Sequence, residues 1–249
     1  MTNIRAADDR RLGDAVTIPG DYQLRALMQG PAAQRFWHHT KQLVIDRYLP
    51  PARGEFVLDV GCGSGVITSY LGQRGARVLG VDGNPAAVTF ADYRFAAANV
   101  AFRHGYVDEA FGDAEPADKV YCLELIEHLP LRQGRSLLAG VHKALRPGGR
   151  ALITTPNYRS FWPLIEWTMD RFKLAPKMRG DQHVEHYHRR KLVRLAREVG
   201  FRHVRATTTC FLAPWLAGLS WKLATAVHRL ETGTPLVPGS ILVCLLEKD

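Results

Sequence analysis

Short β-branched runs alternate with segments of helical periodicity along most of the chain. Apolar residues three and four positions apart predict helices from about 31 to 49, and at 66–73, 85–98, 132–144 and 189–199. Apolar runs predict seven strands, at 56–60, 77–81, 100–107, 119–125, 150–155, 201–210 and 241–246. Because this alternation requires crossover connections, we expect an α/β fold with a parallel sheet covered on both faces.

Two regions depart from this alternation. Residues 1–30 show no periodicity and are interpreted as a flexible leader. Residues 156–188 are too long for an ordinary loop and have apolar content of their own, including Phe161 and Trp162, so they are interpreted as a lid or substrate insertion. With 249 residues, 46% of them hydrophobic, the chain is expected to form a single domain over 31–249 that carries this insertion.

The strongest chemical signal is the sequence VLDVGCGSG, which ends the first strand and opens a helix. Glycines allow a ligand to approach the backbone closely, and a helix N-terminus offers free N–H groups. Asp82 ends the second strand, 21 residues after Gly61, where a carboxylate can accept both ribose hydroxyls of an adenosine. The alternative is that Asp82 only caps the next helix. A dinucleotide fingerprint would require a third glycine where Val66 stands.

Four segments in this order, VLDVGCGSG, VLGVDGN, KVYCLELIEHL and LRPGGRALITTPN, resemble the class I S-adenosylmethionine (SAM)-dependent methyltransferases. Within that class, the sequence is similar to the ubiquinone-biosynthesis O-methyltransferases and related small-molecule and lipid methyltransferases. The resemblance covers about residues 31–210. It implies a Rossmann-like, seven-stranded, mostly parallel sheet with helices on both faces and the last strand antiparallel. It also implies a SAM site formed by Lys41, Asp59, Gly61, Cys62, Gly63, Gly65, Asp82, Gly83, Asn84, Tyr106, Val107, Leu123 and Glu124.

The resemblance further implies methyl transfer to a small or lipid-like hydrophobic acceptor, with oxygen as the expected target. The sulfonium already carries the activation, so the protein mainly aligns the reactants, but an oxygen acceptor must also lose its proton. Histidine is the usual base near neutral pH, and the candidates are His183 first, then His186, and His128 after the fourth strand. The alternative is that these histidines are solvated or tie the lid to the body.

A group of carboxylates and an imidazole follows the fourth strand. Glu124, Glu127 and His128 together are able to bind a divalent cation, and Mg²⁺ would then hold and acidify a catechol oxygen. The alternative is a metal-free site that these side chains close by hydrogen bonds.

Charge and cysteine usage bear on partners and location. The net charge is +9, and residues 171–205 hold eleven basic and three acidic residues beside apolar segments, which suits an anionic membrane surface; the alternative is a solvated basic face. The longest apolar run, 211–227, is too short to span a bilayer.

Four separated cysteines favour a reducing cytoplasm. No base-methylation motif follows the fourth strand, so no nucleic-acid partner is expected, and the oligomeric state stays open.

Two other functions remain open from the sequence. A nicotinamide-dependent Rossmann oxidoreductase would share the glycine turn and Asp82, although Val66 and the LRPGG turn argue against it. A non-catalytic module that binds the cofactor and docks to a membrane or partner enzyme would share the whole SAM site. Binding of SAM rather than a nicotinamide cofactor would distinguish a methyltransferase from the oxidoreductase. Methyl transfer to any acceptor would exclude the non-catalytic module.

Overall fold

The structure, a computed structural model, describes residues 19–108, 115–171, 183–232 and 238–249. The strands in these ranges are β1 (Phe56–Val60), β2 (Arg77–Asp82), β3 (Val100–His104), β4 (Ala117–Leu123), β5 (Leu145–Pro156), β6 (His203–Thr209) and β7 (Ile241–Glu247). The helices are α2 (Tyr22–Gln29), α3 (Ala32–Tyr48), α4 (Val66–Gln73), α5 (Pro85–Phe95), the short η2 (Ile126–His128), α6 (Leu131–Ala144), α7 (Trp162–Arg171), α8 (Arg189–Glu198), α9 (Ala213–Leu216) and α10 (Trp221–Glu231).

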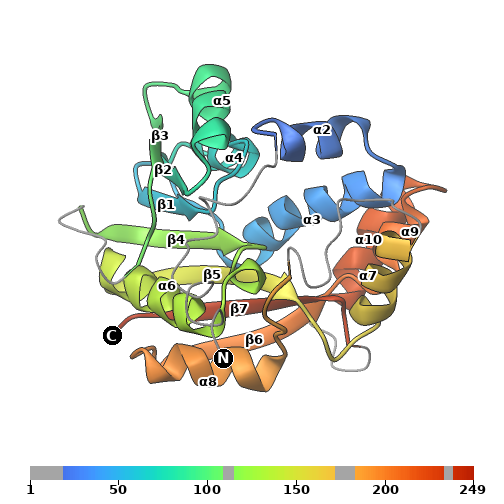
Figure 1. Ribbon diagram of the computed structural model, residues 1–249. Coiled ribbons are helices and arrows are strands. Elements are labelled where there is room, and N and C mark those ends of the chain that lie inside the picture. Colours follow the sequence, from blue (N-terminus) through green and yellow to red (C-terminus); the bar gives the residue numbers. More distant parts are fainter. Residues whose placement is uncertain (1–18, 109–114, 172–182, 233–237) are drawn as a thin grey trace, which may run out of the picture.

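All seven strands form one sheet in the order β3-β2-β1-β4-β5-β7-β6 (Figure 1). The strand pairs β3–β2, β2–β1, β1–β4 and β4–β5 are parallel, and β7 runs antiparallel to both of its neighbours, β5 and β6. The expected seven-stranded, Rossmann-like sheet is therefore confirmed. In the register, Val60 lies between Val81 on β2 and Cys122 on β4, so these three strands end at the same edge. Whatever follows them in sequence is brought together there.

Helices cover both faces of the sheet. On one face, Leu138 of α6 and Leu192 of α8 are buried in the same apolar cluster as Val120 of β4. On the other face, Ile45 of α3 and Leu71 of α4 pack in a second cluster. Burial of both faces explains why the central strands are almost continuously apolar rather than alternating.

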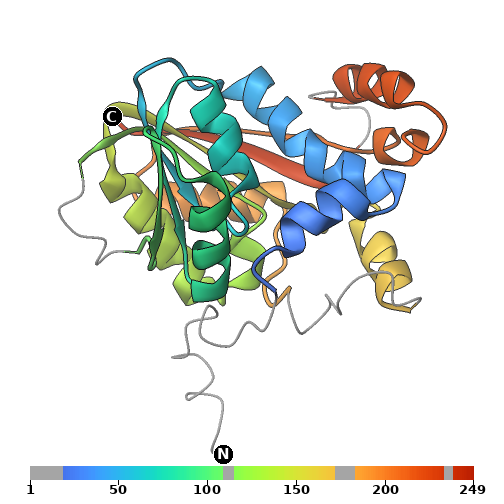
Figure 2. The ribbon, with the colours of Figure 1, turned by 90° about the horizontal axis from the view of Figure 1, so that it is seen from above.

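Residues 19–30 correct the prediction of a flexible leader. Helix α2 lies beside α3 (Figure 2), and the Leu24 N–H donates to Ser64 Oγ at 3.1 Å. A side chain at Gly20 would clash with the Ala86 carbonyl, so this segment also lies tight against α5. The periodicity was too weak to show the helix because only Ala26 of its eight residues is buried. Its stability comes from tertiary contacts, and only residues 1–18 of the predicted leader lie outside the described residues.

Smaller differences concern element ends and the predicted insertion. Strand β5 begins at Leu145 rather than 150, because Leu145 already pairs with Ala117, and β3 ends at His104 rather than 107. Of the insertion predicted at 156–188, the structure gives helix α7, whereas residues 172–182 lie outside the described part. Whether this region acts as a lid stays a prediction.

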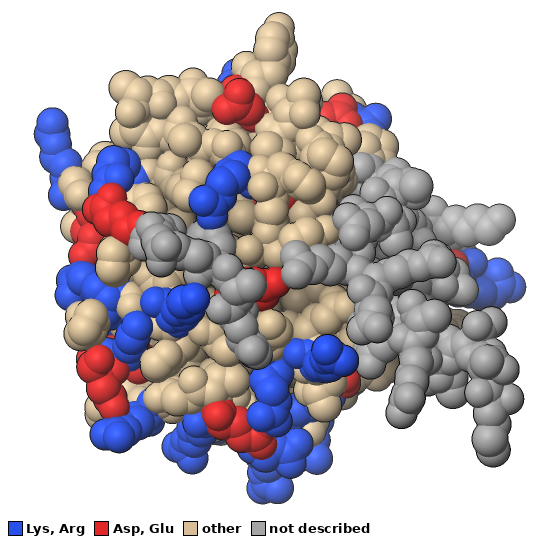
Figure 3. Space-filling view, turned by 60° about the vertical axis from the view of Figure 1, so that its left-hand side comes forward, with Lys and Arg blue, Asp and Glu red and all other residues tan. Residues whose placement is uncertain are grey.

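Basic side chains gather toward the lower part of the face in Figure 3, the level at which α8 lies in Figure 1. Arg189, Arg190, Arg194 and Arg197 of α8 are all exposed. The described helices include none that is both long and apolar enough to cross a membrane.

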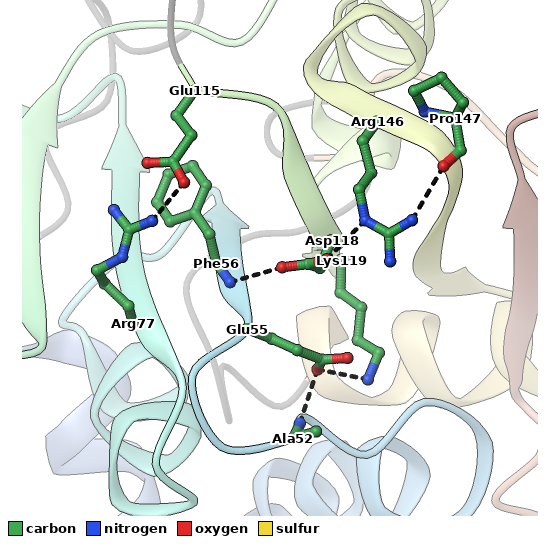
Figure 4. A network of polar contacts seen from close by, with 9 residues as sticks. All are labelled: Ala52, Glu55, Phe56, Arg77, Glu115, Asp118, Lys119, Arg146 and Pro147. Atoms are coloured by element: carbon green, nitrogen blue, oxygen red, sulfur yellow. Dashed lines mark hydrogen bonds and ion pairs between the residues drawn. The ribbon is translucent and has the colours of Figure 1, made fainter.

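A polar network lies at the amino ends of β1, β2 and β4 (Figure 4). Lys119 donates to Glu55 Oε2 at 2.6 Å and to the Pro50 carbonyl at 2.8 Å. Asp118 accepts from the Phe56 N–H at 2.8 Å and also from Arg146. The Arg146 hydrogen bond lowers the pKa of Asp118. This network joins the strands at the edge opposite the glycine turn.

Candidate active site

A cavity of about 1050 Å³ opens at the carboxyl ends of β1, β2 and β4. Helices α2, α3, α6, α7 and α9 and the turns after these strands contribute to its wall. Nine of the residues predicted to bind the cofactor line it: Lys41, Gly61, Gly63, Asp82, Gly83, Asn84, Tyr106, Val107 and Glu124. The sheet register and the packing of α3 thus bring together residues spread over more than eighty positions of sequence.

The other four predicted cofactor residues lie behind this wall: Asp59, Cys62, Gly65 and Leu123. Asp59 is buried and accepts a hydrogen bond from Thr68 Oγ1 at 2.6 Å, and burial raises its pKa to about 6. Gly65 begins α4 with φ +78°, and a side chain there would strike α5 and β3. These residues support the glycine turn rather than face the cavity.

Asp82 joins the two turns that form one end of the cavity. Its Oδ2 accepts from the Gly63 N–H at 2.7 Å, and its Oδ1 accepts from the Asn84 N–H at 2.8 Å. Burial raises the pKa of Asp82, and these two backbone hydrogen bonds oppose the rise. A carboxylate has about four acceptor positions, so two remain for a ligand. Asn84 also caps α5 through its side chain. The capping geometry and a ribose-binding role are therefore compatible.

Helix α2 supplies residues that the sequence did not reveal. Tyr22 and Gln23 line the cavity, and the Gln23 amide lies against Gly63, where a glycine with φ +50° leaves room for it. The sequence did not predict that Tyr22 and Gln23 line the cavity, because their position depends on how α2 packs against the rest of the protein. The cavity is therefore bounded by a segment that precedes the predicted domain.

Glu124 and Glu127 place two carboxyl groups at the end of β4. Glu124 has φ +59°, a strained conformation for a residue with a side chain, and such strain is concentrated at functional sites. Within the described residues its Oε1 is buried without a hydrogen-bond partner. Burial and the neighbouring Glu127 raise the pKa of Glu124 to about 7, while Lys41 opposes the rise. Glu127 Oε2 accepts from Thr155 Oγ1 at 2.9 Å, and burial raises its pKa as well.

His183 lies beside these carboxyl groups. The N–H groups of Val184 and Glu185 donate to the Glu127 carbonyl at 3.0 and 3.1 Å, which fixes the His183 loop against η2. The imidazole lines the cavity, is 6% exposed, and its Nδ1 lies 2.7 Å from Glu166 Oε1 of α7. Burial alone would lower the pKa of His183, but the Glu166 hydrogen bond and the charge of Glu127 outweigh it and raise the value.

The other two candidate bases are placed differently. His128 lines the cavity, and its ring centre lies 5.1 Å from that of His183. His186 is exposed, does not line the cavity, and stacks on Tyr158 with ring centres 4.0 Å apart. Two of the three predicted histidines are thus brought together, and the third faces outward.

The structure does not support the predicted Mg²⁺ set. The groups that come within 4.8 Å of one another in the described residues are Glu127, His128 and His183, so His183 takes the place expected for Glu124. Mg²⁺ prefers oxygen ligands in octahedral geometry, and two imidazoles with one carboxylate do not provide them. In this structure Glu127 is hydrogen-bonded to Thr155 and His183 to Glu166.

One wall of the cavity is apolar and aromatic. Trp162 of α7 is tilted against Trp37 of α3, with ring centres 5.0 Å apart. Leu164, Ile165 and Trp215 extend the same wall. This aromatic wall belongs to the same cavity as the polar side chains of His183 and Glu124.

Comparison with known proteins places this chain in a family. The family described as a methyltransferase domain matches residues 33–206, well over half of the chain. The chain belongs to the methyltransferase domain family. The match begins within α3 and ends within β6, so it contains the glycine turn, Asp82 and the His183 loop of this methyltransferase domain.

Curated relatives of the methyltransferase domain include ubiquinone biosynthesis O-methyltransferases. That of Pseudomonas paraeruginosa is 35% identical over 107 residues, which cover 42% of this chain and 45% of the relative. That of Thiobacillus denitrificans is 29% identical over 189 residues, covering 74% and 76%. The chain therefore matches about half the length of the first of these curated relatives.

Solved structures agree on the fold at low sequence identity. A SAM-dependent methyltransferase of Thermotoga maritima, described as a possible histamine N-methyltransferase, has a TM-score of 0.66 at 18% identity and covers 92% of this chain and 95% of its own. The magnesium protoporphyrin IX methyltransferase of Synechocystis, solved with bound SAH, has a TM-score of 0.61 at 16% identity, covering 96% and 98%. These likenesses concern the fold alone.

Proposed function

We propose that the chain is a SAM-dependent methyltransferase that methylates an oxygen atom of a small or lipid-like hydrophobic acceptor. The observation that carries the proposal is that one cavity joins the glycine turn and Asp82 to an aromatic chamber, with the buried His183 between them. The family match and the ubiquinone O-methyltransferase relatives support the same chemistry.

The lining residues fit SAM as a cofactor. Asp82 keeps two acceptor positions for the ribose hydroxyls, and the N–H groups at the start of α4 suit a carboxylate. Lys41 lines the cavity on the side of Glu124 and would balance the buried carboxyl charge or pair with the cofactor carboxylate. The unpartnered Glu124 Oε1 is an acceptor for an ammonium group or a hydroxyl.

Bound SAM supplies an activated methyl group, so the side chains of this protein have two remaining tasks. The aromatic wall around Trp162 would orient the acceptor and exclude water. His183 would take the proton that the acceptor oxygen must lose, because it is the buried imidazole at the polar end of the chamber.

Calorimetric titration of the purified protein tests this proposal. We expect micromolar binding of SAM and of S-adenosylhomocysteine, and no binding of NADH, which would exclude the oxidoreductase alternative. Transfer of labelled methyl from SAM to catechol or a prenylated phenol, with and without Mg²⁺, then separates an enzyme from a non-catalytic module. NADH binding, or binding of neither sulfur ligand in the presence of these phenols, contradicts the proposal.

We also propose that the acceptor is reached from an anionic membrane surface. Leu164 and Trp215 both line the cavity and are 59% and 57% exposed, so they lie at its mouth. Phe161, the residue before α7, and Trp167 on α7 add exposed apolar area. Co-sedimentation with vesicles containing phosphatidylglycerol tests this: Trp167→Gln is expected to weaken binding, whereas Tyr93→Gln, an exposed aromatic on α5, is not. Equal binding of both variants contradicts it.

A further inference from the structure

Helix α7 carries a buried carboxylate that the chemistry above does not use. Glu166 is 1% exposed, although glutamate side chains are seldom buried without a partner. Its Oε1 lies 2.7 Å from His183 Nδ1 and accepts a hydrogen bond from Tyr158 Oη at 2.8 Å. Tyr158 Oη itself lies 3.2 Å from the same ring nitrogen. Two side chains, Glu166 of α7 and Tyr158 from the segment between β5 and α7, thus converge on one nitrogen of the imidazole.

We propose that Glu166 is a positioning residue that holds the proton on Nδ1 of His183 and so makes Nε2 the atom that receives the proton of the acceptor. This inference rests on the proposed function. A neutral imidazole has one N–H and one free lone pair, and the partner of one nitrogen decides which role the other has. A carboxylate accepts only, so Nδ1 must be the donor. Nε2 is then the basic nitrogen that His183 offers to the cavity.

The acceptor oxygen forms a bond to the methyl carbon, and the carbon–sulfur bond breaks with its electron pair left on sulfur. The O–H proton of the acceptor moves to Nε2, which leaves an imidazolium with both nitrogens protonated. Glu166 then faces a full positive charge, and a hydrogen bond to a charged group is about twice as strong as a neutral one. Glu166 therefore stabilises the products of proton transfer more than the reactants.

Tyr158 has a second, weaker part in this arrangement. Its hydroxyl donates to the carboxylate oxygen that faces His183, which fixes the rotamer of Glu166. Burial and the hydrogen bond to Glu166 raise the pKa of Tyr158, so it stays a neutral donor. The carboxylate therefore has two donors and no competing cation among the hydrogen bonds of the described residues.

Nitrogen NMR of the histidine-labelled full chain tests the inference without any turnover. In the wild type, at a pH above the raised pKa of His183, we expect the His183 signal, assigned by its loss in His183→Gln, to show the Nδ1–H form. In Glu166→Gln the neutral carboxamide holds that proton less strongly, so the bias toward Nδ1–H is expected to fall.

Kinetics with catechol as the probe acceptor give a second measurement. In Glu166→Gln, kcat is expected to drop ~10-fold or more, while the KM for catechol and the Kd for SAM change less than about 2-fold. Tyr158→Phe is expected to lower kcat by only about 2- to 5-fold.

Glu185→Gln is the matched control. Glu185 lies in the same loop two residues from His183, but its carboxylate pairs with Lys191 and does not line the cavity. This variant is expected to keep the wild-type tautomer, kcat and KM.

Three results would overturn the inference. The first is that the neutral imidazole of the wild type carries its proton on Nε2. The second is that Glu166→Gln leaves both the tautomer and kcat unchanged. The third is that Glu166→Gln loses affinity for SAM while the tautomer stays intact, because this would show that Glu166 has a purely structural role. If the wild type transfers no methyl group to catechol, the proposed function fails in that assay, and the tautomer measurement still decides the role of Glu166.

Discussion

The two ends of the central strands arrange charged groups in opposite ways. At the amino end, Lys119 is paired with Glu55 and Asp118 with Arg146, so each charge meets one of opposite sign (Figure 4). At the carboxyl end, Glu124 and Glu127 lie near each other. There, burial and the neighbouring carboxyl raise the pKa of Glu124 to about 7, and its Oε1 has no partner among the described residues.

This difference separates a structural network from a site. Pairing offsets the cost of desolvating a charge, whereas a buried carboxyl beside another carboxyl has no such compensation. Perturbed pKa values and a strained backbone occur together at functional sites, where groups are held in arrangements that lower stability. The carboxyl end has both, in Glu124, whereas at the amino end the pKa of Asp118 is lowered by pairing with Arg146 rather than raised by burial.

The largest effect is expected from Asp82→Ala at the carboxyl end. This change removes the proposed acceptors of the ribose hydroxyls. It also removes the hydrogen bonds from the Gly63 and Asn84 N–H groups, which join the two turns. The affinity for SAM should fall ~100-fold or more, since each hydrogen bond to a charged group contributes about 1.5–3 kcal/mol. Calorimetry measures the loss, with Asp92→Ala on the exposed side of α5 as the control. Unchanged affinity would show that Asp82 only caps α5.

Breaking the amino-end network should affect stability but not binding. In Lys119→Met, Glu55 keeps its hydrogen bond from the Ala52 N–H but loses its cationic partner. Urea unfolding is expected to show a loss of about 2 kcal/mol, below the full value for a buried pair because Glu55 is partly exposed. The Kd for SAM should stay the same. Glu55→Gln in the same chain should recover part of the loss, and a weakened cofactor affinity would show that the two ends are coupled.

Glu124→Gln should have the opposite effect on stability. The pKa of Glu124 is raised to about 7 in the folded state, so this residue holds a proton that the unfolded chain releases near 4.5. Its contribution to stability is full below pH 4.5 and is lost as the pH rises to about 7. At pH 8 the variant should therefore be more stable than the wild type by about 1–2 kcal/mol. Thermal unfolding at pH 8 and pH 4.5 measures this, and an equal difference at both pH values would exclude titration of Glu124 as the cause.

The smallest effect is expected for Arg77→Ala, also at the amino end. Arg77 pairs with Glu115, but both side chains are more than half exposed. Exposed pairs contribute about 0–1 kcal/mol, so the unfolding free energy should fall by less than about 0.5 kcal/mol. A loss as large as that of Lys119→Met would mean that burial is not what distinguishes the two pairs.

Local signals in the sequence predicted much of the fold and part of the site. The seven strands, the glycine turn and Asp82 follow from short-range patterns, because strand periodicity and turn chemistry act over a few residues. The sequence missed α2 and placed His186 among the candidate bases, although it stacks on Tyr158 outside the cavity. It also gave no sign of Glu166, which is separated from His183 by seventeen positions.

By itself, the sequence determined which residues end parallel strands, and therefore that Gly61, Asp82 and Glu124 share one edge of a sheet. Only the tertiary structure decided what meets them there. The carbonyl of Glu127 accepts two backbone N–H groups of the His183 loop, and α7 brings Glu166 to the imidazole. These contacts depend on how a loop and a helix pack against the sheet edge. Such packing is set by the shape and hydrogen bonding of distant segments, and no local spacing encodes it.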